Sequence, residues 1–114
     1  MLLCVDDHPF GLKVLKLLLQ RQGYDVVTAT SGQEALKIFA ENPIKAVVLD
    51  YAMPEMNGAE VAAELKRLRP EIKIMMLSAH RDLPDEVFNL VDMRMVKGIP
   101  PGEFLAGVQQ LMTC

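Results

Sequence analysis

The sequence predicts an α/β protein in which helices cover both faces of a parallel sheet. Short apolar runs alternate along the chain with amphipathic stretches, and three of the runs are too continuously apolar to have one face in water. Right-handed crossovers between such strands place the helices on both faces. The expected strands are LLCV (2–5), DVVTA (25–29), AVVL (46–49), IKIMML (72–77) and the weaker MRMV (93–96).

The stretches between these strands place apolar residues on one helical face, as surface helices of globular proteins do. The predicted apolar faces are Val14, Leu15, Leu18 and Leu19; Ala35, Leu36 and Phe39; Val61, Leu65 and Leu68; and Phe104, Leu105, Val108, Leu111 and Met112. Ser31 and Glu34 have the spacing of a capping box, Gly23 follows the first helix, and Pro101 suits a first helical turn.

The segment 83–91, LPDEVFNLV, predicts only a short helix. Pro84 can start a helix but not continue one, and Asp92 follows soon after the apolar residues end. The fourth helix is therefore expected to be shorter than the others.

Length and composition indicate one folded domain spanning 1–114. The chain has 114 residues, of which 51% are hydrophobic and 24% charged, as in globular proteins. A net charge of -3 provides no basic surface, so we expect no direct nucleic-acid binding by this domain.

We expect a cytoplasmic protein with no membrane segment. No apolar run approaches the ~18 residues of a membrane helix, and Asp6 and Asp7 interrupt the N-terminus before a signal peptide could form. Cys4 lies inside the first apolar run, where a buried reduced thiol is expected.

Candidate site residues follow four of the five predicted strands. Ligands of parallel α/β sheets bind at the carboxyl ends of the strands, so these side chains are expected to share one edge. Each alone is typical of a turn or a helix cap, but together they indicate a site. The residues are Asp6 and Asp7 after the first strand, Asp50 after the third, Ser78 after the fourth and Lys97 after the fifth.

Three carboxylates at one edge of the sheet require a nearby cation to offset their mutual repulsion. Two carboxylates about 4 Å apart repel by roughly 4 kcal/mol at an effective dielectric of 20. Oxygen ligands without a cysteine pair or a histidine spacing suit Mg²⁺ rather than zinc. With Lys97 and Ser78, the site has the groups that an incoming phosphoryl group needs, including a carboxylate nucleophile.

These residues resemble the receiver domain of bacterial response regulators, the CheY-like superfamily of two-component signalling. The resemblance lies in the pair Asp6-Asp7, the stretch DYAMPEMNG (50–58), Ser78-Ala79 and Lys97, and it spans nearly the whole chain. It implies a flavodoxin-like (βα)5 three-layer sandwich with strand order 2-1-3-4-5.

The resemblance also implies a role for each residue of the site. Asp50 is the phospho-acceptor, and Ser78 and Lys97 contact the phosphoryl oxygens after transfer from a histidine kinase or a phosphotransfer protein. Asp7 and Asp50 bind Mg²⁺ directly together with the backbone carbonyl of Ala52, and Asp6 acts nearby or through water.

A receiver domain is a regulatory switch, not an enzyme, apart from catalysing its own phosphorylation and hydrolysis. The resemblance implies that phosphorylation changes binding of a downstream protein or of a fused output domain, by couplings of about 1–3 kcal/mol. A phosphorylation-dependent homodimer through the face of the last two helices is a further expectation of the family.

Three departures from the family pattern leave another interpretation open. Gly98 follows Lys97 where the family has proline, Arg94 stands where the family often has tyrosine or phenylalanine, and the segment between Ser78 and Lys97 is short. They favour the alternative of a pseudo-receiver, a protein-interaction module that is not phosphorylated. An aspartate-nucleophile phosphatase fits poorly, because Ala52 stands where such enzymes need a second carboxylate.

The two histidines are not expected to bind the metal. His8 precedes the helix that begins at Pro9, and we expect its side chain to point away from the acidic pair. His80 is at a position that in the family borders the phosphoryl group, and a solvated loop histidine is the equal alternative.

Overall fold

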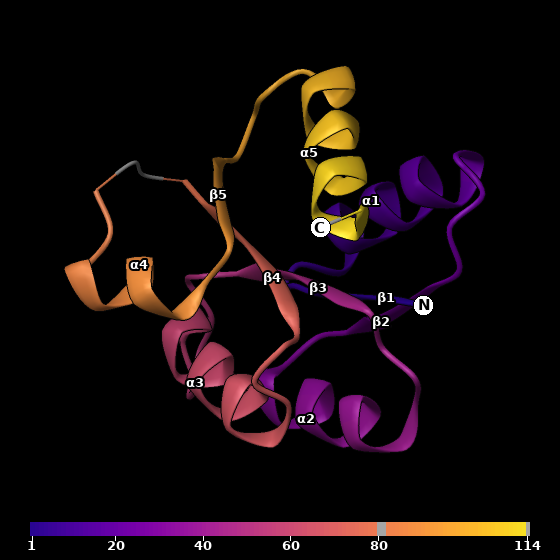
Figure 1. The fold of residues 1–114 in the computed structure, drawn as a ribbon. Coiled ribbons are helices and arrows are strands. Elements are labelled where there is room, and N and C mark those ends of the chain that lie inside the picture. The colour runs from indigo at the N-terminus through magenta and orange to yellow at the C-terminus, as the bar shows by residue number, and fades with distance from the viewer. Residues whose placement is uncertain (80–81, 114) are drawn as a thin grey trace.

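The computed structural model describes residues 1–79 and 82–113, so the prediction for His80 lies outside the described residues. Within this part of the chain, strands and helices alternate without exception (Figure 1). The elements are β1 (Leu2–Val5), α1 (Pro9–Arg21), β2 (Val26–Ala29), α2 (Gly32–Glu41), β3 (Ala46–Asp50), α3 (Gly58–Leu68), β4 (Lys73–Ser78), α4 (Asp85–Leu90), β5 (Met93–Val96) and α5 (Pro101–Thr113).

The sheet has the predicted topology. Its five strands lie in the order β2-β1-β3-β4-β5, and every neighbouring pair is parallel. This confirms the flavodoxin-like arrangement. All five carboxyl ends therefore meet at one edge, where the predicted site residues lie.

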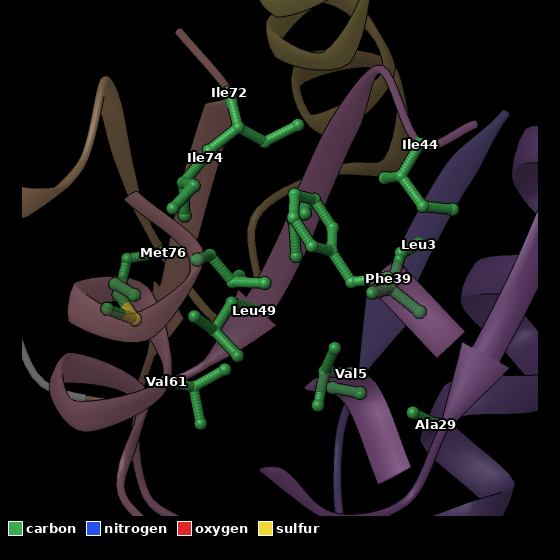
Figure 2. Close-up of a cluster of buried hydrophobic side chains, with 14 of the residues drawn as sticks. Leu3, Val5, Ala29, Phe39, Ile44, Leu49, Val61, Ile72, Ile74 and Met76 are labelled. Atoms are coloured by element: carbon green, nitrogen blue, oxygen red, sulfur yellow. The ribbon is translucent and has the colours of Figure 1, made fainter. Parts of the chain in front are cut away.

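Two hydrophobic clusters hold the helices to the two faces of the sheet. The cluster under α2, α3 and α4 contains Phe39, Val61 and Val87, and Figure 2 shows Phe39 and Val61 among the strand side chains of this cluster. The opposite cluster contains Leu12 and Leu19 of α1 and residues of α5. Figure 1 shows α1 and α5 on the side of the sheet opposite to α2 and α3.

Alternation along the central strands explains why their sequences are apolar throughout. In β1, Leu3 and Val5 belong to the cluster under α2 and α3, whereas Leu2 and Cys4 belong to the cluster under α1 and α5. Both faces of the strand are covered by helices and excluded from water, so neither set of side chains can be polar. Cys4 is buried and unpaired as expected, and burial raises the pKa of its thiol to about 12.

Some element boundaries differ by one residue from the predicted ones. β2 begins at Val26 rather than 25, and β4 runs from Lys73 to Ser78 rather than over 72–77. The difference that matters for the site is in β3. This strand includes Asp50, because Asp50 pairs with Leu77 of β4. The predicted acceptor is therefore held within the sheet and not in the loop after it.

Helix termini follow the predicted signals with one change. The Ser31 hydroxyl accepts a hydrogen bond from the Glu34 N–H, but the Glu34 carboxylate accepts from the Thr30 N–H, one residue before the position in a capping box. A complete capping box joins Asn57 and Glu60 at the start of α3, which the sequence analysis did not single out. Gly23 follows α1 with a positive φ of 92°.

Two residues of the predicted apolar helix faces are exposed. Val14 in α1 is 42% exposed, and Leu68 in α3 is 48% exposed. In α1 the buried residues are Leu12 and Leu19, so the side of the helix that faces the core is narrow and excludes Val14. Leu68 is exposed because it is the last residue of α3. In contrast, α4 has the predicted short length of 6 residues. Within the described ranges, no helix is both long and apolar enough to span a membrane.

Candidate functional site

The end of β1 contributes two carboxylates. The Asp6 N–H donates to the Ala29 carbonyl at 3.1 Å, which extends the contact between β1 and β2 by one residue. Asp6 is buried, and the Asp7 side chain is 24% exposed. The chain therefore places one carboxylate under the site and one at its edge.

Asp50 lies at the centre of the site. It is 2% exposed, and its Oδ1 atom lies 2.9 Å from the Lys97 ammonium. Its Oδ2 atom is buried and has no hydrogen-bond partner among the described residues. A buried carboxylate oxygen without a partner is costly, so this atom is available for a ligand.

Lys97 reaches the site although its loop departs from the family pattern. Its backbone N–H donates to the Ser78 carbonyl at 2.7 Å, which fixes the start of the loop beside the end of β4. Gly98 has a φ of 90°, a conformation that glycine adopts without strain, and the described residues contain no cis peptide bond. The ammonium lies 3.5 Å from Asp6 Oδ2 as well as close to Asp50, while the buried Ser78 ends the adjacent strand.

The pKa shifts reflect an excess of negative charge. Burial, reinforced by the charges of Asp6 and Asp7, raises the pKa of Asp50 despite its bond to Lys97. Burial would lower the pKa of Lys97, but its contacts with Asp50 and Asp6 raise it. Burial would raise the pKa of Asp6, but the His8 N–H and Lys97 lower it. One ammonium therefore contacts two of the three carboxylates, and a divalent cation would neutralise the remaining negative charge.

His8 is turned toward the acidic pair, so the prediction that it points away is wrong. Its backbone N–H donates to Asp6 Oδ1 at 2.9 Å, which closes a tight turn and brings the ring back over the carboxylates. The Nδ1 atom lies 3.2 Å from Asp6 Oδ1 and 3.1 Å from Asp7 Oδ1. No sequence pattern gave this turn, because it depends on where β1 stops.

The residues present fit a hard divalent cation. Asp6, Asp7, His8 and Asp50 offer donor atoms that all lie within 4.8 Å of one another. Asp7 Oδ1, like Asp50 Oδ2, is buried without a hydrogen-bond partner among the described residues. Two unsatisfied carboxylate oxygens in an oxygen-rich cluster are the donors that Mg²⁺ prefers.

The loop after β3 is fixed by Gly58, whose role the sequence analysis did not identify. The Gly58 N–H donates to the Tyr51 carbonyl at 2.7 Å. A Cβ atom at Gly58 would lie 2.7 Å from the Asp50 carbonyl oxygen and 2.8 Å from Tyr51 Cα. Only glycine allows α3 to start this close to the end of β3, and the loop so closed contains Ala52, the predicted carbonyl ligand.

An apolar cavity of about 520 Å³ opens beside the site, between α1 and the segment that joins β5 to α5. No sequence pattern indicated this cavity, because its walls come from four separate elements. Its lining includes Leu15, Leu77 and Phe104, together with Asp6 and Lys97 of the site.

Comparison with known proteins agrees with this site. The family model described as "Response regulator receiver domain" matches residues 2–100. Transcriptional regulatory protein GlrR of Escherichia coli is 42% identical over 86 residues, which cover 75% of this chain and 19% of GlrR. Alkaline phosphatase synthesis transcriptional regulatory protein PhoP of Bacillus subtilis is 35% identical over 114 residues, covering 97% of this chain and 48% of PhoP. The chain thus spans less than half the length of these two relatives.

A solved structure shares both fold and sequence. Response regulator protein TrrA from Thermotoga maritima, crystallised in complex with Mg²⁺-BeF, has a TM-score of 0.91 and 36% identity, with 96% of each chain covered. The sheet order, the acidic cluster at the carboxyl edge and these matches lead to one conclusion. The chain belongs to the response regulator receiver domain family, the CheY-like domains of two-component signalling.

Proposed function

We propose that this receiver domain accepts a phosphoryl group on Asp50 and that the modification switches the binding of a partner. The observation that supports this best is the environment of Asp50 at the end of β3. One of its carboxylate oxygens contacts Lys97 at 2.9 Å, and the other is buried without a hydrogen-bond partner among the described residues. A pseudo-receiver would have no need of such a carboxylate.

In the proposed transfer, an Asp50 oxygen attacks the phosphorus of a phosphohistidine on a histidine kinase or phosphotransfer protein. The new P–O bond forms as the P–N bond breaks, and the leaving imidazole keeps the electron pair and takes a proton from solvent. Lys97 and the hydroxyl of Ser78 hydrogen-bond the phosphoryl oxygens, which gain charge near them. Asp7, Asp50 and the Ala52 carbonyl, with Asp6 nearby, would hold Mg²⁺, which offsets the negative charge of the carboxylates and the phosphoryl group.

The phosphodonor protein has an apolar surface on which to dock beside the site. Phe10, Val14 and Leu17 of α1 are 81%, 42% and 58% exposed. Phe10 follows His8 by two positions, so a partner that covers α1 also reaches the carboxylates. Exposed apolar side chains gathered on one helix are typical of interaction sites.

The proposed output is regulatory. GlrR and PhoP are transcriptional regulators of more than twice this length, so we propose a fused output domain or a separate downstream protein as the responding partner. Signalling of this kind places the protein in the cytoplasm, and a phosphorylation-dependent homodimer is one form that the response takes in our proposal.

Intact-protein mass spectrometry after incubation with acetyl phosphate tests the proposal. We expect a gain of one phosphoryl group, ~80 Da, that requires both Mg²⁺ and Asp50. The variant Asp50→Asn should gain no mass, and Asp25→Asn, which removes an exposed carboxylate at the start of β2, should behave like the wild type. If no adduct forms and beryllofluoride also fails to bind, the pseudo-receiver alternative is correct.

A further inference from the structure

We propose that His8 is a ligand of the metal site and shifts its preference from Mg²⁺ toward borderline transition metals such as Mn²⁺ and Co²⁺. The proposal rests on the metal site of the proposed function. It concerns a nitrogen donor that the acidic residues do not provide.

The position of the imidazole agrees with direct coordination. An octahedral ion with bonds of about 2.1 Å has neighbouring ligand atoms about 3.0 Å apart and opposite ligand atoms about 4.2 Å apart. His8 Nδ1 lies 3.2 Å from Asp6 Oδ1 and 3.1 Å from Asp7 Oδ1. With Asp50 included, the donor atoms all lie within 4.8 Å of one another, so a small inward movement of the side chains brings them to this spacing.

The contact between His8 and Asp7 is the second observation that supports coordination. Asp7 Oδ1 is buried without a hydrogen-bond partner among the described residues, although the imidazole nitrogen is only 3.1 Å away. Two atoms at this distance without a hydrogen bond between them have the spacing of neighbouring ligands of one ion. The competing explanation is the hydrogen bond between His8 Nδ1 and Asp6 Oδ1 at 3.2 Å.

The ring is held by its turn and not by packing. The His8 side chain is 73% exposed, so no core contact dictates its direction. Its backbone N–H is bonded to Asp6 Oδ1, which places the side chain at the mouth of the site. A substitution of the ring therefore removes a donor without opening a cavity in the core.

The donor set determines which ions gain from His8. Mg²⁺ prefers oxygen and replaces a missing protein ligand with water, so it gains little from an imidazole. Imidazole suits later first-row ions, and affinity for nitrogen and oxygen sites rises from Mn²⁺ through Co²⁺. A site with His8 as a ligand should bind Co²⁺ more tightly than Mn²⁺, and both more tightly than Mg²⁺.

Calorimetric titration with Mg²⁺, Mn²⁺ and Co²⁺ at about pH 8, where imidazoles are ordinarily neutral, tests the proposal. We expect His8→Ala and His8→Asn to weaken Co²⁺ and Mn²⁺ binding by on the order of tenfold, with Mg²⁺ binding changed less than about twofold. Gln20→Ala is the control, because Gln20 is exposed near the end of α1 that lies away from His8. Pulsed electron paramagnetic resonance of the Mn²⁺-loaded wild type should show coupling to an imidazole ¹⁴N that His8→Ala abolishes.

The outcomes separate this proposal from the proposed function. If Mg²⁺ binds and Asp50 is phosphorylated, but the three affinities keep their ratios in His8→Ala and no ¹⁴N coupling is seen, His8 is only a hydrogen-bond partner of Asp6. If the wild type binds none of the three ions, the metal site itself is wrong and both proposals fail. Circular dichroism of each variant verifies that it is folded.

Discussion

Lys97 Nζ lies 2.9 Å from Asp50 Oδ1, although the residue that follows Lys97 is a glycine. The Lys97 N–H donates to the Ser78 carbonyl at 2.7 Å, and this bond fixes the position of the Lys97 backbone. The side chain therefore reaches Asp50 although the next residue is not proline. The departure at Gly98 therefore does not remove the lysine from the site.

The first prediction is that Asp50→Asn stabilises the metal-free protein. Asp50 is buried beside two other carboxylates, and burial raises its pKa, so its charge opposes folding. Replacing it with a neutral amide should raise the free energy of unfolding by about 1–2 kcal/mol in urea titrations at pH 7 without divalent ions.

Mg²⁺ provides the control for this prediction. An ion that binds only the folded state raises the melting temperature, so Mg²⁺ should stabilise the wild type and leave Asp50→Asn nearly unchanged. Asp25→Asn should match the wild type in both conditions, since Asp25 is exposed. If Asp50→Asn is less stable than the wild type in the absence of metal, the charge argument is contradicted.

The second prediction concerns the contact between α3 and the end of β3. Gly58→Ala should lower the free energy of unfolding by about 1–3 kcal/mol, because its Cβ would meet backbone atoms of Asp50 and Tyr51 that cannot move aside. The loop that carries Ala52 should shift with it, so we expect weaker Mg²⁺ binding in calorimetric titration.

Gly102→Ala is the matched control for Gly58→Ala. A Cβ atom at Gly102, in the first turn of α5, would have nothing within 4 Å. Alanine there should leave the stability unchanged or raise it by up to about 1 kcal/mol, because it restricts the unfolded chain. Equal effects of the two substitutions would show that the close approach at Gly58 is unimportant.

The third prediction is a pH dependence that comes from Asp92, just before β5. Its Oδ2 atom accepts hydrogen bonds from the Ile74 N–H at 2.9 Å and from Lys66 at 3.0 Å. Burial would raise the pKa of Asp92, but these bonds and the charge of Lys73 lower it below its ordinary value of 3.8. The carboxylate therefore stabilises the fold fully above about pH 3.8, and this stabilisation is lost as the pH falls through the lower folded-state pKa.

Urea unfolding of Asp92→Asn against the wild type measures this contribution. We expect a loss of about 0.5–1 kcal/mol at pH 7, mainly from the ion pair with Lys66, since asparagine can still accept from Ile74. The difference should shrink once the pH is below 3.8. A difference that stays constant with pH would mean that the ion pair contributes nothing.

The fourth prediction concerns Arg94, which stands where the family often has an aromatic residue. Its guanidinium lies 3.5 Å from the centroid of the Phe88 ring, so it links β5 to α4. A double-mutant cycle with Arg94→Ala and Phe88→Ala should give a coupling energy of about 0.5–1 kcal/mol. Arg94→Lys should retain less than the full coupling because it loses the stacked planar group, and additive effects of the two alanine substitutions would contradict the link.

The sequence indicated most of the fold because its periodicities report burial directly. Continuous apolar runs predicted strands that are buried on both faces, and polar residues at the ends of those runs predicted an edge where Asp6, Asp50 and Lys97 meet. The exposure of Val14 and Leu68 has two causes, because Leu68 is the last residue of α3 and the core side of α1 is narrow. In α1, the apolar face that periodicity predicts is wider than the part of the helix that packs on the sheet, so periodicity overestimates the number of buried residues.

By itself, the sequence determined the order of elements, the parallel sheet and the set of residues that gather at its carboxyl edge, because these follow from local patterns of polarity. Only the tertiary structure decided that His8 turns back over the acidic pair, that Gly58 must lack a side chain, and that Arg94 stacks on Phe88. For Gly58 and Arg94 this depends on distances between atoms from different elements, and for His8 on how the side chains are oriented within one turn. Such distances are set by how the elements pack, and no local pattern of residues encodes them.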